Sequence, residues 1–108
     1  MSPADFMAPL KLKYLTQLRE RRGEVTDFLA CCEQGRVSEE NHADMRKKTH
    51  RLAGSAATYG FPWISNAARA LETALDAQMD AQSLTDLTRA LLREYDRALA
   101  SRNLEGAG

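Results

Sequence analysis

Apolar residues recur every three or four positions along almost the whole chain, and this spacing is the feature that most constrains the fold. Only three prolines and six glycines interrupt it. No run alternates apolar and polar residues over a length that suits a strand. Because this period places the apolar residues of a helix on one face, the sequence predicts an all-α protein whose amphipathic helices share a core.

The first half of the chain contains two predicted long helices. The first covers about residues 10–34, and Gly35 follows it in the position where helices commonly end. The second begins after Ser38, a residue type whose hydroxyl caps helix N-termini, and it ends at Gly60. Each segment is apolar on one side only, so each is expected to contribute one face to the core.

The second half predicts two more helices. Pro62 stands near the start of the third, where proline is tolerated, and Ser83 with Asp86 forms a predicted capping pair for the fourth. Four long helices joined by short loops predict an antiparallel four-helix bundle. The residues expected in the core of these helices are Tyr14, Leu15, Leu18, Val25, Phe28, Leu29, Cys32, Ile64, Ala67, Ala68, Leu71, Leu75, Met79, Leu84, Leu87, Leu91, Tyr95, Ala98 and Leu99.

Both ends of the chain carry their own signals. Ser2 and the proline after it predict a short additional N-terminal helix over about residues 3–8, which ends before Pro9. At the other end, residues 103–108 are expected to form a frayed tail. If both predictions hold, the core is formed by the residues between the short helix and the tail.

Size and composition limit the class of protein. A chain of 108 residues with 44% hydrophobic residues predicts one domain over residues 1–108, with a core over about residues 10–102. Fifteen basic residues offset fifteen acidic ones, so we expect no nucleic-acid or membrane partner. The sequence contains neither a signal peptide nor a long apolar stretch, and we expect a cytoplasmic, freestanding protein.

One histidine lies on the solvent side of the second helix. At about 100° per residue, His50 falls opposite the apolar stripe, together with Arg46, Lys47, Gly54 and Ala57. An imidazole between cations and very small residues suits the transfer of a phosphoryl group. The stripe on the buried side consists of Met45, Thr49, Leu52, Ala56 and Tyr59.

The surroundings of His50 fit this chemistry. A neutral imidazole has a nitrogen lone pair that can attack phosphorus, and cations stabilise the charge of the product. Lys47 and Arg46 project from the preceding turn, and Arg51 is adjacent, so these three are the candidates for phosphate stabilisation. Gly54 costs the helix about 1 kcal/mol relative to alanine, and room for an incoming active site would explain it.

These residues resemble a known family. The run His50-x-Leu52-x-Gly54-Ser55-Ala56, then Gly60, then Ala67-x-x-x-Leu71-Glu72 on the next helix, is similar to the histidine-containing phosphotransfer (HPt) domain of bacterial phosphorelays. The similarity extends from about Tyr14 to Tyr95. It implies a four-helix bundle in which His50 is the phosphoacceptor, with modification usually on the outer ring nitrogen.

The resemblance also implies a partner and a role. Family members shuttle a phosphoryl group between receiver-domain aspartates, here those of response regulators and hybrid histidine kinases, without kinase or phosphatase activity of their own. The receiver brings the magnesium ion, so no cofactor is expected on this chain. A monomer is expected to dock through Gly54, Ala57 and Ala53.

Ala53 is a departure from the family pattern. The family commonly has a lysine three residues after the histidine, where this chain has Ala53. In this chain, only Lys47, Arg46 or Arg51 can take over the role of that cation. This departure keeps an alternative open, namely a helical docking module that binds receiver or kinase domains without being phosphorylated.

Other functions fit the sequence less well. His42 lies eight residues from His50, and Cys31 and Cys32 are adjacent, so these residues match no usual set of metal ligands and the cysteines are expected to be reduced packing residues. No convergent acid, base and nucleophile suggests an enzyme. Trp63, near the junction of the second and third helices, is expected to pack at the edge of the core.

Overall fold

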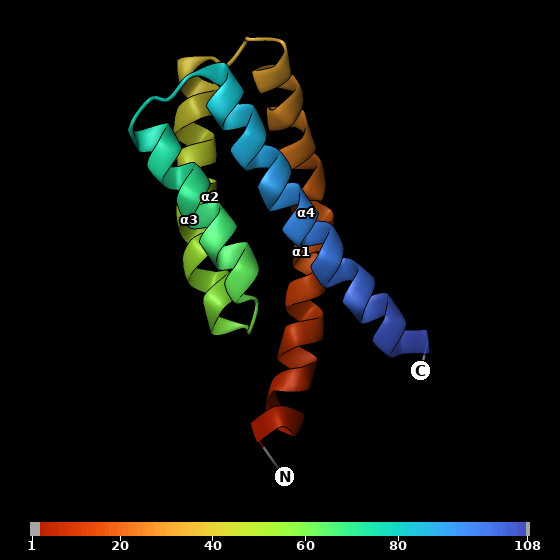
Figure 1. The fold of residues 1–108 in the computed structure, drawn as a ribbon. Coiled ribbons are helices and arrows are strands. Elements are labelled where there is room, and N and C mark those ends of the chain that lie inside the picture. The colour runs from red at the N-terminus through yellow and green to blue at the C-terminus, as the bar shows by residue number, and fades with distance from the viewer. Residues whose placement is uncertain (1–2, 108) are drawn as a thin grey trace.

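The computed structural model describes the backbone of residues 3–107 and the side chains of residues 9–100. It contains four helices, α1 (Pro3–Glu33), α2 (Glu39–Thr58), α3 (Pro62–Asp76) and α4 (Ala81–Ala107), and no strand in the described residues. α2 and α3 form one hairpin, and α1 lies beside α4 (Figure 1). This arrangement confirms the predicted all-α bundle. None of the described helices is long and apolar enough to cross a membrane.

The ends of the hairpin form as the sequence predicts. The Ser38 hydroxyl accepts a hydrogen bond from the backbone N–H of Asn41 at 3.0 Å, which caps α2. Gly35 and Gly60 follow α1 and α2 with φ angles of +65° and +87°. Because side chains are strained in this left-handed region, glycine allows the chain to turn sharply at both points.

The prediction of a separate short N-terminal helix was wrong. α1 runs unbroken from Pro3 to Glu33 with Pro9 inside it. Proline removes one backbone hydrogen bond, but the good helix formers on both sides of Pro9 continue the helix across that gap. In the described backbone, α4 continues to Ala107, into the range of the predicted tail. α1 and α4 extend beyond the α2–α3 turn at the end that carries both termini (Figure 1).

The cap of α4 differs from the prediction as well. α4 begins at Ala81 rather than after Ser83. The Asp80 carboxylate accepts a hydrogen bond from the backbone N–H of Ser83 at 2.9 Å, and the Asp80 carbonyl accepts one from Leu84 at 3.0 Å. Asp80 is therefore the N-cap, and Ser83 lies within the first turn of α4.

The core follows the predicted stripes with two exceptions. Met79 is 46% exposed, because α3 ends at Asp76 and Gln78 takes a φ of 52° that turns the chain away from the core. Trp63 is 66% exposed rather than packed at the core edge. Buried alanines let α2 and α3 approach closely, and they are Ala53, Ala56 and Ala68.

The two cysteines are free, as expected. Cys31 is half-buried and Cys32 is buried in the core. Burial raises the pKa of the Cys32 thiol to about 11, so this thiol stays protonated at neutral pH. Cys32 thus acts as a packing residue.

Candidate functional site

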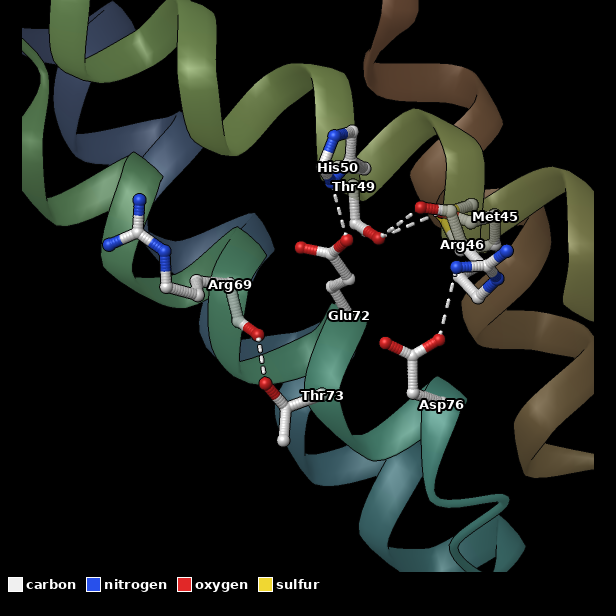
Figure 2. A network of polar contacts seen from close by, with 8 residues as sticks. All are labelled: Met45, Arg46, Thr49, His50, Arg69, Glu72, Thr73 and Asp76. Carbon is white, nitrogen blue, oxygen red and sulfur yellow. Dashed lines mark hydrogen bonds and ion pairs between the residues drawn. The ribbon is translucent and has the colours of Figure 1, made fainter.

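His50 stands on the exposed face of α2, and 76% of its side chain is accessible to solvent. Its Nδ1 lies 2.6 Å from Oε2 of Glu72, a residue of α3 that is only 17% exposed (Figure 2). The exposed imidazole is thus held from the neighbouring helix by a carboxylate that solvent reaches poorly. The placement of His50 on the solvent side agrees with the predicted helical face.

Buried hydroxyls hold this part of α2 in place. Thr49, next to His50, is buried, and its Oγ1 donates to the carbonyl oxygens of Met45 and Arg46, each at 3.0 Å (Figure 2). Buried Ser65 of α3 donates from its hydroxyl to the carbonyl oxygen of Ala53. The Thr49 bonds stay within α2, whereas the Ser65 bond joins α3 to the backbone of α2 and so supports the register in which His50 meets Glu72.

The contact with Glu72 determines which nitrogen of His50 is free. An ionised carboxylate can only accept a hydrogen bond, so Nδ1 carries the proton and donates it to Glu72. Nε2 of the neutral ring then keeps its lone pair. Such a ring can act as a nucleophile toward a group brought by another molecule.

The predicted phosphate-stabilising cations do not converge on His50. Arg46 forms an ion pair with Asp76, with 3.2 Å between Nη1 and Oδ1 (Figure 2). Arg51 lies on another flank of α2, where it lines a cavity of about 330 Å³ between α1, α2 and α4. Lys47 is exposed, and the described side chains give it no ion pair.

Two of the three predicted docking residues are exposed. Gly54 and Ala57 lie on the surface of α2, and a Cβ atom added at Gly54 would meet no atom within 4 Å. Gly54 is therefore not needed for helix packing within this chain. Ala53 is only 4% exposed, because its position three residues after His50 turns it toward α3. The expectation that the Ala53 side chain lies on the docking surface was wrong.

Sequence reasoning missed how α3 contributes to the site. Glu72 was part of the family-like motif, but its contact with His50 spans 22 positions of sequence. Asp76, which pairs with Arg46, was not singled out at all. The available signal was the helical period of both segments, which predicts the exposed faces but not the register between them.

Comparison with known families agrees with this geometry. The profile of the Hpt domain family matches residues 10–101, so the chain belongs to this family. Hpt domains are phosphocarrier modules of phosphorelays, and the family interacts with receiver domains. Neither curated proteins nor solved structures gave a significant match.

Proposed function

We propose that His50 accepts a phosphoryl group from the aspartyl phosphate of a receiver domain and passes it to another receiver aspartate. The observation that carries this proposal is the exposed imidazole whose Nδ1 lies 2.6 Å from the Glu72 carboxylate, in a chain of the Hpt family. The same proposal includes a monomeric, cytoplasmic bacterial protein.

The transfer step assigns a role to each ring nitrogen. The Nε2 lone pair attacks phosphorus, the bond between phosphorus and the aspartate oxygen breaks, and the aspartate leaves as a carboxylate. The ring is positively charged until the Nδ1 proton leaves, and Glu72 stabilises that charge through its hydrogen bond. Glu72 is thus a positioning residue. The reverse step returns the phosphoryl group to a receiver.

Docking uses the exposed surface beside His50. Gly54 and Ala57 present almost no side-chain bulk there, which lets the acidic pocket of a receiver approach. Lys47 and Arg46 lie on the preceding turn of α2 and attract that pocket. The magnesium ion belongs to the receiver, and this chain needs no cofactor.

The test is phosphorylation by a phosphorylated receiver in the presence of magnesium. Wild type should acquire a phosphate that is labile in acid and stable in alkali, and His50→Gln should not. His42→Gln is the matched control, because it removes the only other histidine. Circular dichroism verifies that each variant is folded.

Each result has a clear meaning. Label on wild type and His42→Gln, but not on His50→Gln, supports the assignment. Equal label on His50→Gln would contradict it. If no receiver from a broad panel phosphorylates wild type but some bind, the chain is instead a docking module.

A further inference from the structure

A phosphoryl group on His50 needs a neighbouring positive charge, and the two cations on the preceding turn of α2 differ in how available they are. Arg46 is bound to Asp76 at 3.2 Å, whereas Lys47 forms no ion pair with the described side chains. The Arg46–Asp76 pair would have to weaken before Arg46 could bind phosphate. Neither Arg46 nor Lys47 lies on the turn after His50, where the family commonly has its lysine. An unpaired cation on the same face has no such cost.

The register of α2 against α3 identifies such a cation. His50 meets Glu72, and Arg46, one turn earlier on α2, meets Asp76, one turn later on α3 (Figure 2). The same antiparallel register places Ala53 opposite Arg69. Arg69 is thus the α3 residue that lies level with the turn after His50.

The surroundings leave the Arg69 guanidinium available. Arg69 is exposed, and no acidic side chain among residues 9–100 forms an ion pair with it. Figure 2 shows its guanidinium clear of both Glu72 and Asp76. Across from it, Ala53 offers only a buried methyl group, so no α2 side chain at this level competes for the space above the two helices.

On the basis of the proposed function, we propose that Arg69 binds the phosphoryl group carried by His50, from the neighbouring helix. Axes of packed helices lie about 8–10 Å apart, a distance that an arginine side chain and a phosphohistidine can bridge together. The planar guanidinium can donate two parallel hydrogen bonds to phosphate oxygens. The chain thereby places on α3 the positive charge that α2 lacks at position 53.

The experiment measures how the phosphoryl group distributes at equilibrium between this chain and a receiver. Arg69→Gln should shift the distribution toward the receiver by about two- to fivefold at low salt, as expected for an exposed charge pair. Arg69→Lys should shift the distribution less than Arg69→Gln does, because lysine keeps the positive charge but lacks the two parallel N–H donors of the guanidinium. Arg93→Gln, an exposed arginine of α4, is the matched control and should behave as wild type.

Salt separates a charge effect from a change of structure. In 0.5 M NaCl the Debye length falls to about 4 Å, so the difference between Arg69→Gln and wild type should largely vanish. A difference that persists at high salt, an equal shift in Arg93→Gln, or an Arg69→Gln variant that behaves as wild type at low salt would each overturn the assignment.

The two proposals fail in different ways. Before the distribution is measured, phosphoramidate, a small phosphoryl donor, tests whether wild type takes up phosphate without any receiver. If neither phosphoramidate nor a receiver labels wild type, the proposed function fails and the role of Arg69 fails with it. If wild type is labelled and Arg69→Gln distributes phosphate as wild type does, only the role of Arg69 is rejected.

Discussion

At the scale of single residues, the orientation of the exposed His50 ring depends on one carboxylate from the neighbouring helix. His50 Nδ1 and Glu72 Oε2 are 2.6 Å apart, and the Glu72 side chain is much less exposed to solvent than the His50 side chain. Restricted access to water strengthens a hydrogen bond, so this contact is expected to hold the ring more firmly than a fully exposed pair would. The remaining ring nitrogen is left to react.

Two substitutions of Glu72 separate orientation from charge. Glu72→Gln keeps an oxygen that accepts from Nδ1, so we expect the rate of phosphoryl transfer to stay within about fivefold of wild type. Glu72→Ala removes the acceptor, and we expect a loss of about tenfold or more, in line with a hydrogen bond to a charged group. Single-turnover transfer from a phosphorylated receiver measures both. Wild-type transfer by Glu72→Ala would contradict the positioning role.

Gly54 offers a second test at this scale. Since an added Cβ meets nothing within 4 Å, Gly54→Ala should stabilise the helix by up to about 1 kcal/mol and leave receiver binding intact. Gly54→Leu should also keep the fold, but its bulk should weaken receiver binding at least tenfold. Thermal unfolding and a binding titration measure these effects. Unchanged receiver binding in Gly54→Leu would exclude the docking role of this surface.

At the scale of elements, helix ends and register come from short polar contacts. Asp80 caps α4, Ser38 caps α2, and the hydroxyl of Ser65 joins α3 to the backbone of Ala53. In this contact, Ala53 lies about one turn from His50 on α2, and Ser65 lies about two turns from Glu72 on α3. The contact therefore helps to maintain the register on which the site depends.

The cap at Asp80 predicts a specific dependence of stability on pH. Hydrogen bonds from Ser83 lower the pKa of the Asp80 carboxyl below its ordinary value of 3.8. A lowered pKa in the folded state means that the cap stabilises the protein above about pH 4 and that this contribution disappears as the pH falls through the folded-state pKa. At pH 7, Asp80→Ala should melt a few degrees below wild type.

The same comparison at low pH provides the control. Because the wild-type cap is lost when Asp80 is protonated, the difference in melting temperature between wild type and Asp80→Ala should shrink as the pH falls from 5 toward 2. Asp86→Ala, at an exposed position six residues further along the chain, should show no comparable trend. A difference that grows on acidification would rule out this role of the cap.

At the scale of the whole molecule, the site lies on the exposed side of the α2–α3 hairpin, and the second helix pair completes the core behind it. Ion pairs between Arg22 and Asp96 and between Glu33 and Arg89 connect α1 to α4. Tyr14 of α1 connects this helix pair to the α2–α3 hairpin. Its hydroxyl oxygen lies 2.7 Å from Ser55 Oγ, and its ring stacks on that of Tyr59 with 4.6 Å between the ring centroids. The bundle thus supports the site without covering it.

This division predicts that stability and phosphotransfer can be altered separately. Leu71 is fully buried beside Glu72, so Leu71→Ala should lower the free energy of unfolding by about 2–5 kcal/mol. His50→Gln should change it by less than about 0.5 kcal/mol, because the ring is largely exposed. Urea unfolding measures both. A large loss of stability in His50→Gln would show that the ring supports the fold.

The amino-acid sequence was enough to predict the helical class, most of the core, the exposed position of His50 and the open space at Gly54. These properties follow from the period of one helix, which local residues encode. The unbroken passage of α1 through Pro9 and the cap at Asp80 were decided by competition between neighbouring local signals.

Helix packing, which the sequence pattern does not show, sets the partner of His50, the pairing of Arg46 with Asp76 and the burial of Ala53. Each of these depends on the rotation and register of α2 against α3. Those quantities arise from close packing of alanines and from buried hydroxyl contacts, and they join residues that are far apart in the chain. A helical period shows which face of a helix is exposed, but packing decides what lies opposite it.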